Sequence, residues 1–346
     1  MYLHFGFVVR NAQCQVCKYV NDFGIIAPDS QQHRVREHTM PIRELNQADL
    51  PTVLDLCQRA LPLDTFSAQL IQRHMLDEPE RNPAFQFGFW EGDELRGVLL
   101  GGTRRIDDGH TLLHRPRPVG VLKLIATDPA YRRQGIASQL ITALIERMRD
   151  AGLTWLRSGN FAPSYFWPGV DARYTPALCF LQRHGFQRKG DAVNMAVDLH
   201  AHTWDTADEE ERLLGVGIRI RRAQPSDADA FGAWLGQAWG PIWQWEGLRA
   251  LHNQPPSAFV AERDGEFCAF AAYNTSSFPH VFGPTGTVED QRAQGIGRVL
   301  LCRCLRDLRD AGCSQAEIGW VGPIAFYARV ADATINRVFF WHEREL

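Results

Sequence analysis

The sequence lacks the features of a membrane protein and of a general nucleic-acid-binding protein. Its apolar runs all fall short of the about 18 residues that a membrane-spanning helix needs. Residues 1–9 are apolar, but no basic residue precedes them and no small-residue cleavage pattern follows, as a secretory signal would require. The 37 Lys and Arg against 40 Asp and Glu leave a formal charge of −3, without the basic excess of nucleic-acid binders. We therefore expect a cytoplasmic protein with no membrane or nucleic-acid partner.

A cysteine framework is also missing. Cys14 and Cys17 form one C-x-x-C pair, without the second ligand pair that a zinc site requires. The other six cysteines are scattered through apolar patterns. We expect reduced, mostly buried thiols and no metal site.

What the sequence does contain is a repeat. Residues 132–137 read Arg-Arg-Gln-Gly-Ile-Ala, and residues 292–297 read Arg-Ala-Gln-Gly-Ile-Gly. The run Arg-Asp-Ala-Gly follows each of them at the same spacing. The 346 residues are enough for two domains. We predict an N-terminal extension with poor order at 1–39, a first copy at 40–200, an acidic linker at 201–217 and a second copy at 218–346.

Each copy has the same predicted order of elements. A short strand and an amphipathic helix are followed by a hairpin, which in the second copy turns at Asp264-Gly265. An apolar strand then leads through the repeated turn into a long helix with one apolar face, which ends at Gly152 or Gly312. A strand, a helix and a final strand complete the copy. This order predicts an α/β (α+β) fold with a mixed sheet.

The repeated turn has the properties of a pyrophosphate site. Gly135 and Gly295 let the backbone turn tightly where a strand passes into the long helix. The free amides of the first helical turn attract an anion, and nearby arginines supply charged donors. The fingerprints G-x-G-x-x-G and G-x-x-x-x-G-K-[ST] are absent from both turns, which argues against NAD-type and P-loop nucleotide sites there.

The pattern [QR]-x-x-G-x-[GA] between a strand and an amphipathic helix resembles the acetyl-CoA site of the GNAT superfamily of N-acetyltransferases. Residues 124–137 match closely, including Asp-Pro and Tyr before the arginines, whereas residues 286–297 lack the proline. The resemblance covers about residues 40–346. It implies two tandem GNAT folds, acetyl-CoA as co-substrate, no metal, and a cleft where the strand before each turn splays from the next strand. The cofactor-binding residues that it implies are Ile125, Ala126, Thr127, Arg132, Arg133, Gln134, Gly135, Ile136, Ala137, Gly286, Thr287, Val288, Arg292, Ala293, Gln294, Gly295, Ile296 and Gly297.

The resemblance also implies a catalytic residue. Many family members carry a tyrosine, on the helix after the splayed strand, that protonates the departing thiolate. Tyr327 falls on that position in the second copy, and Leu181 falls on it in the first. We therefore expect turnover in the second copy; the alternative is that Tyr327 only packs. The general base stays unassigned among Glu262, Glu289, Asp171 and His280.

The acceptor is expected to be a primary amine of a small molecule, with an amino sugar as the leading candidate. The first copy carries an aromatic insert at 161–175, in which Trp167 and Asp171 are candidate substrate-binding residues. The alternative is that this insert packs on its neighbours. Other open alternatives are an acetyltransferase for a protein N-terminus, lysine or antibiotic amine, and a non-catalytic CoA-binding sensor. The sequence leaves the oligomeric state undetermined.

Overall fold

A computed structural model describes most of the chain. The described ranges are residues 41–78, 81–104, 118–159, 165–275 and 278–346. Contacts divide the chain into a unit of residues 1–39 and a unit of residues 40–346. The expected poor order of the N-terminal extension concerns residues outside the described ranges, so it stays a prediction.

The first copy alternates helices with the strands of a mixed sheet. Four strands pair antiparallel in order from the edge, and the fourth then pairs parallel with the next strand. The elements are β1 (Ile42–Glu44), α1 (Leu50–Ala60), α2 (Ala68–Met75), β2 (Gln86–Glu91), β3 (Glu94–Arg104), β4 (Val119–Thr127), α3 (Ile136–Asp150), β5 (Trp155–Ser158), β6 (Val170–Asp171), α4 (Thr175–Arg183) and β7 (Gln187–Asp198).

The second copy repeats this order, and the predicted fold class is confirmed. Its elements are β8 (Ile218–Arg222), α6 (Ala228–Trp239), α7 (Pro241–Leu251), β9 (Ala258–Arg263), β10 (Glu266–Tyr273), β11 (Val281–Thr287), α8 (Ile296–Asp310), β12 (Gln315–Ile318), α9 (Ile324–Ala331) and β13 (Thr334–Glu345). None of the helices in the described ranges is long and apolar enough to cross a membrane.

Helices cover both faces of the sheet in each copy. In the first copy, α1 and α2 pack on one face, and α3 and α4 pack on the other. In the second copy, α6 and α7 pack on the face that corresponds to that of α1 and α2, and α8 and α9 pack on the opposite face. Alternate residues of the central strands enter the two cores, as strand geometry requires. We refer to these two sides of the second copy as the α6/α7 face and the α8/α9 face.

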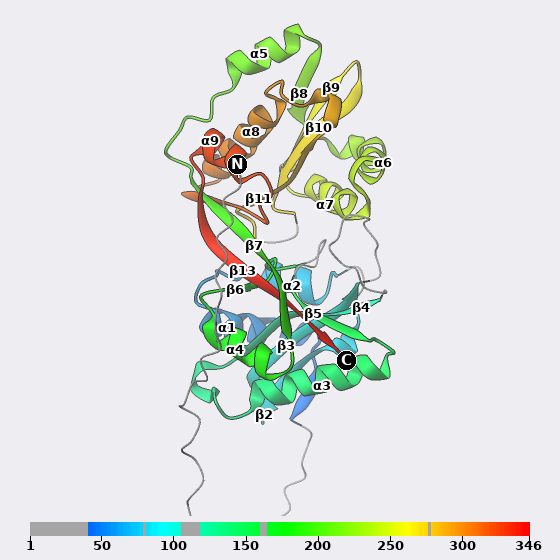
Figure 1. Cartoon of the computed structure of the whole chain (residues 1–346), viewed down its shortest axis with the longest axis vertical. Coiled ribbons are helices and arrows are strands. Elements are labelled where there is room, and N and C mark those ends of the chain that lie inside the picture. The colour runs from blue at the N-terminus through cyan, green and yellow to red at the C-terminus, as the bar shows by residue number, and fades with distance from the viewer. Residues whose placement is uncertain (1–40, 79–80, 105–117, 160–164, 276–277) are drawn as a thin grey trace, which may run out of the picture. The chain divides into compact units, whose positions relative to one another are not determined.

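The final strands of the two copies are exchanged. β13, which ends the second copy, pairs antiparallel with β5 of the first copy. β7, which ends the first copy, pairs antiparallel with β12 of the second. β7 and β13 also pair with each other and lie side by side (Figure 1). The result is one continuous sheet with the strand order β1-β2-β3-β4-β5-β13-β7-β12-β11-β10-β9-β8.

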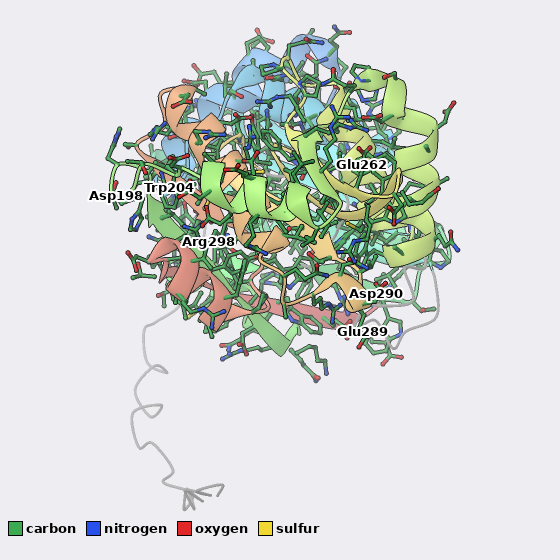
Figure 2. The ribbon with its side chains drawn as sticks, turned by 90° about the horizontal axis from the view of Figure 1, so that it is seen from above. Asp198, Trp204, Glu262, Glu289, Asp290 and Arg298 are labelled. Atoms are coloured by element: carbon green, nitrogen blue, oxygen red, sulfur yellow. The ribbon has the colours of Figure 1, made fainter. Side chains whose placement is uncertain are left out.

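The segment expected to be a linker contains a helix, α5 (Ala207–Gly215). Its Leu213 is buried in the core beneath α8. Its acidic residues pair with α8: Glu209 pairs with Arg298, and Glu210 accepts from Arg303 Nε at 2.7 Å. Figure 2 shows Arg298 beside α5. The acidic run is therefore the charged side of a helix that joins the second copy.

Candidate functional site

The two repeated turns have the same backbone conformation. Gly135 and Gly295 are the N-cap residues of α3 and α8, with φ of 83° and 91°. Arg133 and Ala293, two residues earlier, also have positive φ, at 66° and 63°. A Cβ at Gly135 would have only Gln139 Nε2 near it, at 4.0 Å. A Cβ at Gly295 would lie 3.0 Å from Arg212 Nη2. Each turn is a left-handed loop at a helix N-terminus, and this geometry fits a pyrophosphate.

Charged side chains fix the turn of the first copy. Arg132 donates from Nη2 to the carbonyl of Ala60 at 2.9 Å. Asp128 accepts from the amide of Ala130 at 3.0 Å and from Arg59 at 2.5 Å. Burial raises the pKa of Asp128, but the hydrogen bond from Arg59 helps to outweigh it, so the pKa lies below its usual value. Asp128 therefore stays ionised and anchors the loop to α1.

The turn of the second copy is held by different cations. Arg212 of α5 donates from Nη2 to the carbonyl of Gln294 at 2.6 Å. Arg263 of β9 donates to the side chain of the same residue at 3.1 Å. Both arginines add positive charge beside the loop. Sequence analysis missed Arg212 because it lies in the expected linker; the acidic first turn of a helix was the signal that could have located it.

Both copies contain the splayed pair of strands. The parallel pairing of β4 with β5 ends at Leu122 and Ser158. The pairing of β11 with β12 ends at Phe282 and Ile318. We call these last paired residues the separation point of each copy. Within the described residues, no strand pairs with β4 or β11 beyond this point on that side. The implied pantetheine-binding edges at residues 125–127 and 286–288 therefore begin within four residues of each separation point, counted along the chain.

Tyr327 lies on α9 beside the separation point of the second copy. Its ring centroid is 6.2 Å from that of Phe282, a member of the last strand pair. The side chain is 5% exposed, and burial raises its pKa to about 12. Its hydroxyl has no hydrogen-bond partner among the described residues. Leu181 of the first copy is instead a buried member of the core beneath α3.

A lysine that sequence analysis missed lies directly after the separation point of the first copy. Lys123 forms a one-residue bulge in β4, between Leu122 and Leu124. Its Nζ lies 2.9 Å from Glu78 Oε2 and donates to the carbonyl of His74 at 3.0 Å. Burial lowers its pKa to about 8. A charged residue in an apolar strand was the available signal, and the equivalent residue of the second copy is Gly283.

The described part of the aromatic insert packs against the loop after α1 and against β13. Trp167 donates from Nε1 to Asp64 at 3.0 Å, and its ring contacts Phe66. Asp171 pairs with Arg173 and with Arg337 of β13, at 2.7 and 2.8 Å. These contacts favour the packing alternative, and substrate contact by Trp167 and Asp171 stays a prediction. Residues 160–164 of this region lie outside the described ranges.

The candidate bases lie in different surroundings. Glu289 is exposed, next to Asp290, on the short turn before α8 (Figure 2). Glu262 pairs with Arg221 at 2.5 Å. Asp171 carries two arginine partners, as described above. His280, just before β11, is the remaining candidate: the backbone carbonyl of His280 accepts from the amide of Glu317 at 3.1 Å.

Comparisons with known proteins agree with this geometry. A mycothiol acetyltransferase from Thermomonospora curvata is 28% identical over 205 residues, which are 57% of this chain and 64% of that protein. A fungal glucosaminidase contains a glucosamine N-acetyltransferase region that matches at 18% identity with a TM-score of 0.68, over 88% of this chain and 38% of that protein. A tandem GNAT protein from the clavulanic acid pathway matches at 15% identity with a TM-score of 0.62, over 88% of this chain and 98% of its own. The chain thus spans less than two thirds of the first two proteins. At these identities, the two structures show the fold alone.

A family model covers both left-handed turns. The model of the acetyltransferase (GNAT) family matches residues 50–163 and, separately, residues 223–330. Each matched range contains one splayed strand pair and one left-handed turn, so the predicted tandem organisation is confirmed. The chain belongs to the GNAT family of acetyltransferases, with two GNAT domains in one polypeptide.

Proposed function

We propose that the chain transfers an acetyl group from acetyl-CoA to a primary amine of a small molecule, and that turnover takes place in the second copy. The observation that carries this assignment is the position of Tyr327, whose ring contacts Phe282 where β11 and β12 separate. In the first copy, Leu181 stands in the place of the phenol, and Lys123, next to the separation point, is bound to Glu78 and His74.

Acetyl-CoA supplies an activated thioester. The turn at residues 292–297, with Arg212 and Arg263 beside it, binds the pyrophosphate. The open edge of β11 provides amides for the pantetheine arm and for the developing oxyanion. The same elements in the first copy bind a second acetyl-CoA without using it.

The transfer needs two proton movements. The neutral amine attacks the thioester carbonyl, a C–N bond forms, and the C–S bond breaks. The attacking nitrogen loses a proton to a base, and the departing sulfur takes a proton from the Tyr327 hydroxyl. With a pKa of about 12, the phenol holds its proton at neutral pH. The burial that raises this pKa also disfavours a bare thiolate, so the sulfur takes a proton as the C–S bond breaks.

An amino sugar is the leading acceptor class. The sequence relative named mycothiol acetyltransferase supports a small-molecule amine. The described contacts of Trp167 and Asp171 are internal, so they give this choice no independent support.

The test is thiol release from acetyl-CoA with a panel of glucosamine, a lysine peptide and an aminoglycoside. We expect one amine to accelerate release, and Tyr327→Phe to lower kcat by about 10² to 10⁴ with little change in KM for acetyl-CoA. Tyr273→Phe is the control for loss of a phenol hydroxyl, because the hydroxyl of Tyr273 donates to Asp307 of α8. Loss of turnover after substitution of Arg132 or Gly135, with Tyr327→Phe fully active, would move the reaction to the first copy. Binding of acetyl-CoA with no thiol release for any amine of the panel would indicate a non-catalytic CoA-binding sensor.

A further inference from the structure

The exchanged strands make particular positions of the two copies equivalent. β5 pairs with β13 so that Arg157 lies opposite Glu343. β12 pairs with β7 so that Glu317 lies opposite Ala196. The pairing of β7 with β13 is also unchanged when the two copies are interchanged, and it has one register shift near each end. Arg157 and Glu317 are therefore equivalent positions, and Glu343 and Ala196 are equivalent as well.

In the first copy these two positions carry a buried ion pair. Arg157 donates from Nε to Glu343 Oε1 at 3.0 Å. The two side chains are 1% and 5% exposed. The guanidinium also lies 4.5 Å from the centre of the Trp341 ring. Protein side chains thus fill this part of the first copy.

In the second copy the equivalent place is a pocket. Ala196 has no side chain long enough to reach Glu317 as Glu343 reaches Arg157. A pocket of about 380 Å³ lies there. The side chains that offer polar groups to it are His280, Ser314, Gln315, Glu317 and Asn336.

The charge around the pocket is negative. Glu317 accepts from Asn194, and its Oε2 lies 3.9 Å from Arg337 Nη1. That guanidinium is already paired with Asp64 at 2.6 Å and with Asp171 at 2.8 Å. Together with Arg173, the group has three carboxylates against two guanidinium ions. One negative charge is therefore in excess where Glu317 lines the pocket.

The neighbouring histidine adds a neutral polar group. Burial lowers the pKa of His280, and Arg337 acts in the same direction, whereas Glu317 and Asp64 raise it. The imidazole is therefore neutral at pH 7. A neutral imidazole both donates and accepts hydrogen bonds, as do the side-chain amides of Gln315 and Asn336. Such groups suit a cation that also carries hydroxyl groups.

Glu317 is the lining residue of β12 that lies next to the point where the strands separate, and residues 312–316, which also line the pocket, lie farther from that point along the chain. Glu317 pairs with Val281, one residue before the last pair of β11 and β12. Its neighbours Ala316 and Ile318 enter the core beneath α8, as Tyr327 does. Glu317 therefore points to the α6/α7 face, and Tyr327 lies on the α8/α9 face. An amine on one side and a leaving thiol on the other can meet where the strands separate.

We propose that this pocket binds the acceptor: a primary amine carrying hydroxyl groups, which binds as an ammonium paired with Glu317 and loses one proton to solvent before the neutral amine attacks. The assignment rests on the proposed function and adds the acceptor site to it. Because β7 supplies Ala196 and β13 supplies Asn336, strands of both copies build the site.

Binding tests the pocket separately from turnover. The full chain, loaded with CoA to prevent reaction, is titrated calorimetrically with glucosamine. We expect one site per chain, affinity about tenfold weaker in Glu317→Gln, and no binding in Ala196→Leu, which fills the pocket. Glu266→Gln is the control, since that carboxylate is exposed on the β10 hairpin. Melting curves establish that each variant is folded; Glu317→Gln is nearly isosteric and serves alone if Ala196→Leu does not fold.

The outcomes separate the two proposals. The assignment of this pocket as the acceptor site is overturned if glucosamine does not bind to the wild type. It is also overturned if glucosamine binds to both variants as tightly as to the wild type. Thiol release with normal KM in both variants leaves the proposed function standing without this site. Glucosamine binding that depends on Glu317, with no thiol release, keeps the pocket and overturns the transferase reaction.

Discussion

Arg157 of β5 and Glu343 of β13 form a buried ion pair between residues that belong to different copies. The pair lies on adjacent strands created by the exchange, with Arg157 directly opposite Glu343 in the register. The last strand of the chain therefore completes the sheet of the first copy, and the stability of that copy depends on residues near the C-terminus.

Removing one member of this pair should be costly. Arg157→Leu removes the guanidinium that pairs with the buried Glu343 carboxylate, and we expect the free energy of unfolding to fall by about 3 to 5 kcal/mol. The double variant Arg157→Leu with Glu343→Leu should cost less, because no charge is left buried. Urea unfolding measures both. A loss no larger than that of Arg309→Leu, which breaks an exposed pair with Asp310, would contradict this account.

The exchange also predicts how the two halves behave when separated. Residues 40–201 expressed alone lack β13 and leave the edge of β5 unpaired, and residues 202–346 alone lack β7. We expect each half to be aggregation-prone by itself and the two to form a one-to-one complex when co-expressed. Co-purification through a tag on one half measures this. Val338→Pro, in the centre of β13, should abolish the complex, whereas Ile335→Ala at an exposed position should not. Two halves that fold separately and stay monomeric would refute the exchange.

The two left-handed turns predict the number of acetyl-CoA sites. Valine at Gly135 or Gly295 is strained at the observed φ of 83° and 91°, and a Cβ at Gly295 would lie 3.0 Å from Arg212 Nη2. We expect calorimetry to find two sites in the wild type and one in each variant. Gly152→Val, strained at a φ of 75° beyond the opposite end of α3 from the loop, is the control for general destabilisation. Unchanged affinity and stoichiometry in both variants would remove the pyrophosphate assignment.

Lys123 should make stability depend on pH in the alkaline range. Its pKa is lowered from 10.5 to about 8 in the folded protein. Between these values the unfolded chain binds a proton that the folded chain does not, so the free energy of unfolding rises with pH. Lys123→Met lacks this contribution. The stability of the wild type relative to Lys123→Met should therefore grow by up to about 3 kcal/mol between pH 7.5 and pH 10.5, as measured by urea unfolding. A constant difference would show that Lys123 keeps its proton.

Local patterns allowed much of this structure to be predicted from the sequence. The apolar stripes of α3 and α8 and the glycines that begin and end them are local signals, and the structure has both helices where they were expected. The partner of each final strand could not be predicted, because β7 and β13 carry a pattern that fits either copy. Lys123 and Arg337 form ion pairs with residues that are distant in the sequence. Such ion pairs produce no recognisable spacing of residues, so the sequence did not predict them.

Covalent linkage of the copies has a consequence for their chemistry. Two identical chains that exchanged their last strands would form a two-fold symmetric dimer, and every substitution would then appear in both halves. Here the two halves are one polypeptide, so equivalent places accept different residues. Glu343 closes its site with an ion pair, while Ala196 leaves the equivalent site open. Because residues 201–217 join the two copies into one chain, the copies can differ in sequence. One copy can then serve as a structural scaffold while the other keeps an open cleft for the reaction.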